Sequence, residues 1–390
     1  MILKTHMAAR YHDKKGTDYT VELFKKLASI PSPSGKEKEV AKFITKELSE
    51  MGIPNYTDDS WRKNHSDTGN VIATLKGSGK CTVMFYAHMD TVAPNLTKPA
   101  IVESKGIIRS VNGAIMGADD KAGVAALISA LRELKEKRHP TIIVAFTTKE
   151  EAAGWRGMGA TFLSPRKKPD YTFVIDDKGR TGSFSPRALG IMYFTITFRG
   201  KGAHAASDPE KGINAIKAAA LFINSLRLGR SKEGDCLNIG TVSGGTFSNV
   251  IPDNAVLTGE VRAFEYKRMI KQLAAVRNCA KKVCGSTGCS YVIKPDVRNA
   301  IPPLNSKDAH LVRIAKAAAD KARIPFSSED MYATCEANVL CRKGHRVIVM
   351  RPGYWNPHSA REYIAAKELV NCKRLVVAIS ETLSMMDKKA

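Results

Sequence analysis

Histidines and acids come after the ends of four short apolar runs of this sequence. In chain order they are His88 and Asp90, Glu150 and Glu151, Asp176, and His358. Imidazole nitrogens and carboxylate oxygens are ligands that zinc accepts without any cysteine. With Asp119, the two histidines, Glu151 and Asp176 make a set of two imidazoles and three carboxylates, which suits a pair of zinc ions about 3.5 to 4 Å apart that share one carboxylate. The chemistry that such a site supports is metal-assisted hydrolysis.

His88 and Asp90 are two residues apart, so in an extended segment their side chains point to the same face. Asp90 could then accept a hydrogen bond from the ring nitrogen of His88 that faces away from a metal, and such a carboxylate orients a metal-bound imidazole. Without this context, a histidine at a strand end is more often merely hydrogen-bonded.

Asp119 and Asp120 stand just before an apolar helical pattern that begins near Lys121. One reading is a helix cap, because an acid at a helix N-terminus suits the dipole. A cap needs one acid and two are present, so we predict that Asp119 bridges two cations.

Glu150 and Glu151 are adjacent at the end of an apolar run. Buried neighbouring carboxylates repel one another unless cations lie nearby, whereas a solvated loop pair is the alternative. Their side chains diverge, which permits one to bind metal and the other to take a proton from the attacking water.

The elements that must position these residues are strands of a mostly parallel sheet. Apolar, β-branched-rich runs suit strands that are covered on both faces, and they occupy residues 70–75, 82–87, 141–147, 171–175 and 346–350. Helical patterns lie between several of them, most clearly at 121–137. Ligand sites of open α/β sheets form beyond the carboxyl ends of the strands, so four strands point at one crevice.

Two helices are predicted over residues 19–52, with a break at 30–35. Ser34 is expected to cap the second helix, and Gly52 to end it.

The residue pattern changes over 187–298, where it predicts a strand, a helix, two strands, a helix and a strand in order. This is the split βαβ order of ferredoxin-like domains. Strand-type sequence resumes after it. We therefore predict a discontinuous catalytic domain at 1–186 and 299–390, with an inserted domain at 187–298.

The net charge of +23 is compatible with nucleic acid or an acidic membrane surface, but Lys and Arg are scattered along all 390 residues rather than gathered with aromatics. A solvated basic surface is favoured and nucleic acid is an unlikely partner.

No apolar stretch approaches the roughly 20 residues of a membrane span. The basic start, 1–15, lacks the apolar core of a secretory signal, which predicts a cytoplasmic protein; an organelle-targeting tail is the alternative.

The eight cysteines are spread over the chain, which predicts reduced thiols. Cys279, Cys284 and Cys289 lack the short spacing of structural zinc sites, so we expect them to be packing residues.

Several motifs resemble those of the zinc aminopeptidase and carboxypeptidase superfamily that includes aminoacylases and peptidase T. They are 87–92, 117–123, 148–151 and 356–359, together with 30–35, 201–204 and 249–252. The Gly-Ala-Asp-Asp-Lys-Ala-Gly run at 117–123 looks most like the peptidase T branch.

The resemblance implies a zinc-peptidase catalytic domain with an inserted lid and dimerisation domain. It implies two zinc ions per subunit, with Co²⁺ or Mn²⁺ as possible substitutes. His88 and Asp176 would hold one ion, Glu151 and His358 the other, and Asp119 would bridge them. Glu150 matches the general base and Asp90 the partner of the first histidine. Whether Asp176 or Asp177 is the ligand stays open, although we favour Asp176.

In the insert, His204 matches a residue that polarises the scissile carbonyl from the neighbouring subunit, although a solvated surface histidine is the alternative. Asn249 and Arg262 match substrate contacts, Arg262 to the substrate carboxylate. The resemblance thus implies a homodimer through the inserted domain.

The implied function is hydrolysis of an amide bond in small peptides, by a tripeptide aminopeptidase. A carboxypeptidase or an N-acyl-amino-acid deacylase would use the same metals, and a non-catalytic binding protein would be expected to lack a ligand or the base. Lys149 and the run 334–338 depart from the family pattern. The preferred substrate side chains therefore stay open.

Overall fold

The computed structural model describes residues 18–92, 97–151, 158–163, 168–298, 300–306 and 308–386. The basic start at 1–15 lies outside these residues. The chain divides into two compact units. The first comprises the chain up to Arg187, Ser306–Met331 and the residues from Cys335 onward, and the second comprises Ala188–Asn305 with Tyr332–Thr334.

The first unit is built around a mixed sheet. Among the described residues it has eight strands in the order β1-β2-β6-β3-β7-β17-β8-β16. Their bounds are β1 Asn55–Thr57, β2 Val71–Leu75, β3 Thr82–His88, β6 Thr141–Thr147, β7 Tyr171–Ile175, β8 Ser183–Ser185, β16 Ser327–Ser328 and β17 Val347–Met350. The four neighbours β6, β3, β7 and β17 run parallel. The mostly parallel α/β core is thereby confirmed.

Strand β2 departs from the parallel arrangement expected of the run 70–75, because it pairs with β6 in the antiparallel direction. Only residues 76–81 join β2 to β3. A parallel crossover needs a dozen or more residues, so this short connection must reverse the chain direction.

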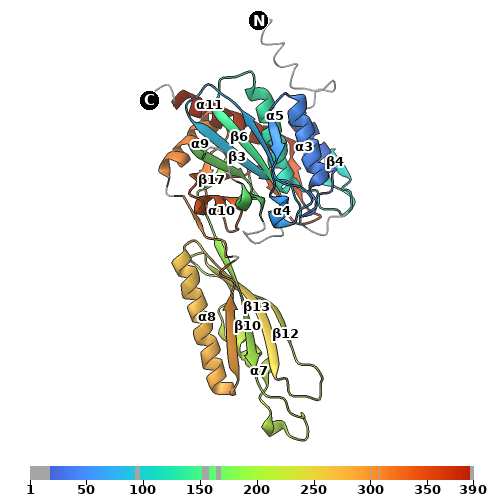
Figure 1. Ribbon diagram of the computed structural model, residues 1–390, viewed down its shortest axis with the longest axis vertical. Helices are drawn as coiled ribbons and strands as arrows, with labels where there is room; N and C mark the ends of the chain where they lie inside the picture. Colours follow the sequence, from blue (N-terminus) through green and yellow to red (C-terminus); the bar gives the residue numbers. More distant parts are fainter. Residues whose placement is uncertain are drawn as a thin grey trace. The chain divides into compact units, whose positions relative to one another are not determined.

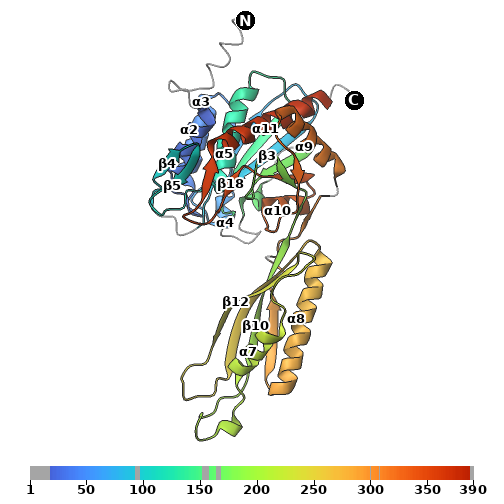
Figure 2. The same ribbon diagram turned by 180° about the vertical axis from the view of Figure 1, so that it is seen from behind.

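A layer of helices covers the sheet. Its members are α2 Tyr19–Ala28, α5 Ala118–Leu134, α9 Ala309–Ala322 and α11 Ala366–Met386. Helix α5 contacts α2 and α11, and α11 contacts α2 and α9; Figure 2 shows α11 and α5 in front of the sheet. Val124, Leu127 and Ile128 of α5 are fully buried, as their periodic spacing predicts.

Helix α3, Lys38–Glu50, ends before Gly52 as predicted, and Gly52 has φ +67°. The prediction that Ser34 caps it is wrong. Glu37 occupies the N-cap position, and the Ser34 hydroxyl donates to Asp90 instead. Ser34 therefore belongs to the site described below.

Shorter elements complete the first unit. They are α4 Trp61–Asn64, α6 Gly159–Phe162, α10 Glu336–Arg342, and the sheet of β18 Tyr354–Trp355, β19 Tyr363–Ala365, β5 Ile107–Ser110 and β4 Ile101–Ser104. Helix α10 packs on β17 and β7 (Figure 1).

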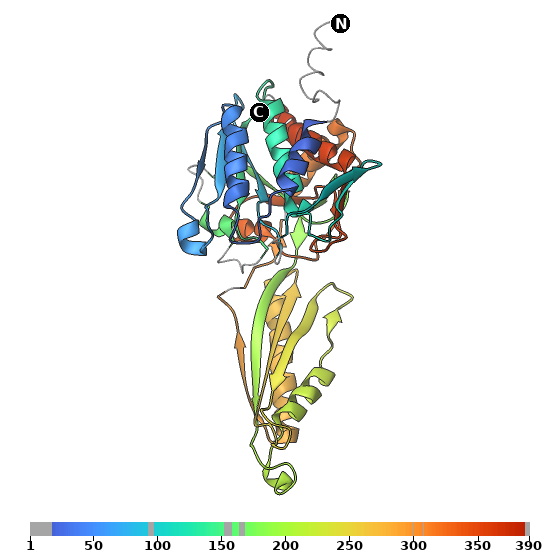
Figure 3. The ribbon, with the colours of Figure 1, turned by 90° about the vertical axis from the view of Figure 1, so that its right-hand side faces the viewer.

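The second unit has the predicted β-α-β-β-α-β order, with the two-residue strand β11 added after the first helix. Its strands are β10 Gly190–Arg199, β11 Gly229–Arg230, β12 Cys236–Gly244, β13 Asn254–Ala263 and β14 Ser290–Pro295, and its helices are α7 Ala215–Ser225 and α8 Tyr266–Thr287. The strands pair antiparallel in the order β11-β12-β13-β10-β14. Helices α7 and α8 contact each other and β13, so both lie on one face (Figure 3).

Minor elements are β9 Arg187–Ala188, β15 Leu304–Asn305 and a 3₁₀ turn at Pro209–Lys211. No helix of the described residues is long and apolar enough to cross a membrane. All eight cysteines fall within the described ranges, and none of them is in a disulfide.

Candidate metal centre

The carboxyl ends of the parallel strands bring the predicted residues to one edge of the sheet. His88 is the last residue of β3, where its register partner is Thr147 at the end of β6. Glu150 and Glu151 follow β6 after two further residues, and Asp176 follows β7 directly. Strand adjacency in β6-β3-β7 therefore places these side chains at the same edge.

Asp119 lies between the two histidines. Its Oδ1 is 3.1 Å from His88 Nε2 and its Oδ2 is 3.1 Å from His358 Nε2. His358 Nε2 is also 2.8 Å from Glu151 Oε1. Ligand atoms of His88, Asp119 and Glu151 all fall within 4.8 Å of one another, which is the spacing of a metal-binding group. One carboxylate facing two imidazoles is the arrangement that a bridging ligand needs.

Asp176, rather than Asp177, faces this cluster. The Tyr354 hydroxyl lies 2.8 Å from Asp119 Oδ1 and 3.1 Å from Asp176 Oδ1, so it joins the two carboxylates. Asp177 turns to Arg351, whose Nε donates to it at 2.9 Å. An arginine already neutralises Asp177, which leaves Asp176 as the acid available to a cation.

Asp90 is buried beneath the cluster and holds three of its members. His88 Nδ1 is 3.0 Å from the backbone carbonyl oxygen of Asp90 and 3.3 Å from its Oδ1. The two carboxylate oxygens of Asp90 accept the backbone N–H groups of Glu150 and Glu151, both at 3.0 Å. The Ser34 hydroxyl donates the remaining contact. Asp90 therefore fixes the ring of His88 and the main chain of both glutamates.

The neighbouring acids Asp119 and Asp120 have separate surroundings. Asp120 Oδ1 accepts the N–H of Gly123 at 3.1 Å, which is the contact of a helix cap. Asp119 has non-helical backbone angles and directs its carboxylate to the histidines. The cap reading is confirmed for Asp120, and the bridging role of Asp119 stays a prediction.

The electrostatics of the site favour a bound cation. Burial raises the pKa of Glu150, and the charge of Asp176 adds to the effect. Burial also raises the pKa of Asp176 to about 8, with Asp119 contributing. Burial alone would raise the pKa of Asp119, but hydrogen bonds from His358 and His88 lower it. So many buried acids repel one another, and divalent cations among these nitrogen and oxygen donors would offset that repulsion. The donor set fits a pair of such cations.

Sequence reasoning missed a set of buried acids that support the site. Glu37 accepts the N–H groups of Gly35 and Lys149, at 2.7 and 3.0 Å. Glu336 accepts the Thr147 hydroxyl at 2.6 Å and the Ala160 N–H at 3.2 Å. Burial raises the pKa of both Glu37 and Glu336 to about 7.

Glu362 and Lys121 are buried at the start of α5. Glu362 accepts the N–H groups of Gly117 and Asp119, and the Lys121 ammonium donates to the Ile30 carbonyl at 2.6 Å. Burial lowers the pKa of Lys121 to about 7. Lys121 lies inside the motif 117–123, Glu37 lies just after 30–35, and Glu362 lies just after 356–359. This proximity to the motifs was the sequence signal that could have found them.

The three predicted substrate residues lie in the second unit. His204 forms an isolated bridge with Val250, and Ala205 N–H donates to the Asn249 carbonyl at 2.9 Å, so His204 and Asn249 lie on adjacent segments. Arg262 is in β13, where its Nε and Nη2 donate to Glu260 at 2.8 and 3.1 Å. The structure therefore brings His204 to Asn249 but not to Arg262.

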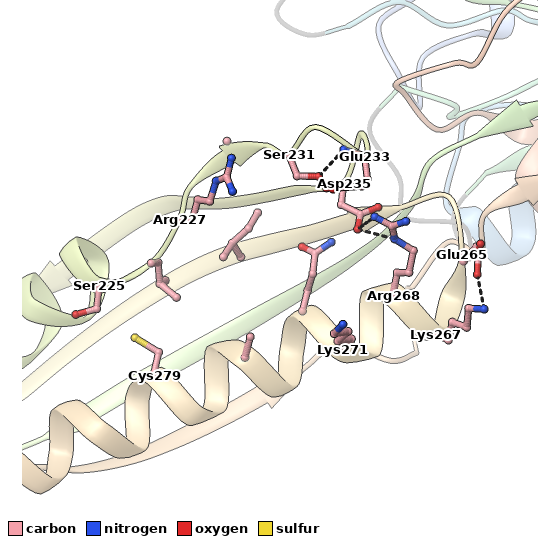
Figure 4. A pocket seen from close by; sticks show the side chains of 15 residues that line it. Ser225, Arg227, Ser231, Glu233, Asp235, Glu265, Lys267, Arg268, Lys271 and Cys279 are labelled. Carbon is pink, nitrogen blue, oxygen red and sulfur yellow. Dashed lines mark hydrogen bonds and ion pairs between the residues drawn. The ribbon is translucent and has the colours of Figure 1, made fainter.

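A cleft of about 1050 Å³ in the second unit lies between α8 and the β11–β12 segment (Figure 4). Two of its three acids are ion-paired, Asp235 with Arg268 at 2.7 Å and Glu265 with Lys267 at 2.9 Å. We assign this cleft no catalytic role.

A family model for Peptidase family M20/M25/M40 matches residues 84–382. This chain belongs to that family. The match spans the ligand cluster in the first unit and the whole inserted unit. Membership of this family shows that the chain is a metal-dependent exopeptidase. The cluster around Asp119 is its candidate metal centre.

Individual relatives are consistent with the peptidase T branch. The Bacillus subtilis protein YqjE is 31% identical, with 93% of this chain and 97% of that protein covered. Peptidase T of Geobacillus kaustophilus is 25% identical, with 93% and 94% covered. The crystal structure of aminopeptidase PepT from Bacillus cereus has a TM-score of 0.85 and 32% identity, with 94% and 98% covered.

Binding of a divalent cation should release protons at pH 7, because the metal-free site holds Asp176 with a pKa of about 8 and His358 with a pKa of about 10. Both groups must lose a proton to act as ligands, so the apparent affinity should rise as the pH increases through 8. Calorimetry in two buffers of different ionisation enthalpy measures the release. Asp176→Asn should reduce it by about one proton, whereas Asp177→Asn should not. Equal effects of the two variants would contradict the assignment of Asp176.

Proposed function

We propose that this exopeptidase is an aminopeptidase that releases the first residue of tripeptides and uses two zinc ions. The observation that supports this proposal most directly is that ligand atoms of His88, Asp119 and Glu151 converge on one point. His358 and Asp176 lie beside them. The likeness to Peptidase T and to an aminopeptidase structure supports the substrate class.

His88 and Asp176 would hold one ion, Glu151 and His358 the other, and Asp119 would bridge them. A bound pair of divalent cations lowers the pKa of water and polarises a carbonyl oxygen. Asp90 keeps the Nε2 side of His88 turned toward Asp119, because it contacts Nδ1 on the opposite side of the ring.

Glu150 is proposed as the general base. Asp90 fixes its backbone, and burial raises the pKa of its carboxyl, which favours proton uptake. Glu150 would take the proton from the attacking water and then deliver it to the leaving amine nitrogen as the C–N bond breaks. His204 would donate to the oxygen of the carbonyl under attack.

His204 and Arg262 of one subunit are too far apart to contact the same tripeptide. His204 bridges Val250, before β13 begins at Asn254, and Arg262 is near the other end of that strand. Eight residues of strand span about 26 Å, whereas an extended tripeptide spans roughly 10 Å. If both residues contact the substrate, they come from different subunits, which supports a homodimer.

The exposed apolar side chains of the inserted unit offer a surface for such a dimer. Phe247 is 73% exposed and Val242 58% exposed. Sedimentation velocity should therefore show a species of twice the 42.5 kDa chain mass, and Phe247→Glu should shift it toward the monomer with loss of activity. A fully active species of 42.5 kDa would contradict the dimeric site.

Glu150→Gln and Glu151→Gln form a matched pair that separates the base from the ligand. Glu150→Gln should lower kcat by about 10²- to 10⁴-fold while zinc stoichiometry stays unchanged, because only the proton acceptor is lost. Glu151→Gln should lose bound zinc, because it removes a ligand charge. Metal analysis with initial rates measures both. Unaltered kcat in Glu150→Gln would remove this residue from the proposed role.

A peptide panel tests the substrate class. The zinc-loaded chain should release the N-terminal residue of free tripeptides and leave N-acetylated tripeptides uncleaved. Mass spectrometry of the products identifies the bond that is cut. Release of the C-terminal residue would favour a carboxypeptidase, and cleavage of N-acetyl amino acids would favour a deacylase. Glu150→Gln serves as the control for contaminating peptidases.

A further inference from the structure

Glu362 links the segments that carry Asp119 and His358. Its side chain is buried, with 2% exposed. Oε2 accepts the Gly117 N–H at 2.7 Å and Oε1 accepts the Asp119 N–H at 3.0 Å. These contacts join positions 245 and 243 residues apart in the chain. The carboxylate therefore holds the main chain of the proposed bridging ligand.

Glu362 is also held close to His358. Its own N–H donates to the carbonyl of Ser359, the residue after His358, at 3.1 Å. The next residues, Tyr363–Ala365, form β19 and pair with β5. One side of Glu362 is thus fixed to the loop of His358 and the other to the segment of Asp119.

The Asp119 segment needs acceptors for its first backbone N–H groups from outside the helix. The first N–H groups of a helix have no partner within the helix, and α5 begins at Ala118. Gly117 has φ +75°, and a Cβ there would lie 2.5 Å from Thr91 Cγ2, so the turn approaches its neighbour closely. Glu362 supplies the acceptors that this turn needs.

We propose that Glu362 is a positioning residue for the metal centre, an inference that rests on the proposed two-metal site. The Asp119 carboxylate lies 3.1 Å from Nε2 of both His88 and His358. It keeps these distances only while Glu362 holds the main chain of Asp119. Loss of the Glu362 contacts frees the Asp119 backbone and weakens both metal positions at once. Because Glu362 contacts the ligand's main chain rather than the peptide, it affects metal affinity and kcat more than KM.

A purely structural role is the competing explanation, since a carboxylate at a helix N-terminus stabilises the helix wherever it occurs. Asp308 provides the matched control. It accepts the N–H groups of His310 and Leu311, at 3.0 and 3.3 Å, at the start of α9. It is also bound by Arg346, which precedes β17 and so lies at the edge of the sheet opposite to the site.

The test is titration of the metal-free chain with zinc against a chromophoric chelator, for the wild type, Glu362→Gln, Glu362→Ala and Asp308→Ala. A glutamine can accept only one of the two N–H groups without placing its own NH₂ against the other. We expect Glu362→Gln to weaken zinc binding about 10- to 100-fold and to lower kcat with little change in KM. Asp308→Ala should lower Tm without changing zinc affinity.

The outcomes separate this inference from the function on which it rests. A wild type that binds no zinc would refute the metal centre and this inference with it. Zinc affinity of Glu362→Gln within about twofold of wild type, beside normal wild-type binding, would refute the positioning role alone. Glu362→Gln keeps the volume of the side chain, so it stays informative if Glu362→Ala does not fold.

Discussion

Electrostatic repulsion among buried acids is the constraint on which the rest of this structure depends. Asp90, Asp119, Glu150, Glu151 and Asp176 are gathered at one edge of the sheet with His88 and His358. Removing ionised carboxylates from water is costly unless positive charge compensates it. Raised pKa values at Glu150 and Asp176 express that cost in the metal-free chain. Bound divalent cations would reverse it, which is why so unfavourable a cluster can persist in an otherwise apolar core.

A second set of buried acids keeps the cluster in place. Asp90, Glu37 and Glu362 each accept backbone N–H groups from, or beside, a proposed ligand or the base. Glu336 reaches the Thr147 hydroxyl at the end of β6. Partners of this kind restrict the ligands to one geometry, so metal affinity depends on residues that never touch metal. The same acids explain why short loops can present several ligands accurately.

The two departures from the family pattern have structural roles in this fold. The Lys149 ammonium donates to the Asn64 carbonyl at 2.8 Å, and its N–H is held by Glu37. Glu336, in the run 334–338, supports Thr147 and Ala160. Members of one fold differ in substrate through contacts made by particular side chains.

The sequence by itself determined the positions of the main strands, the order of the candidate ligands and the family. Continuous apolar runs marked β6 and β7 at the observed bounds, and the acids after them were visible without coordinates. The split βαβ order of the insert was equally local. Only the tertiary structure decided the partner of Ser34, the reversed direction of β2, and the roles of Tyr354 and Glu362. Ser34 meets Asp90 across 56 residues and Glu362 meets Gly117 across 245. Local periodicity carries no information about such pairs, because folding alone brings their backbones together.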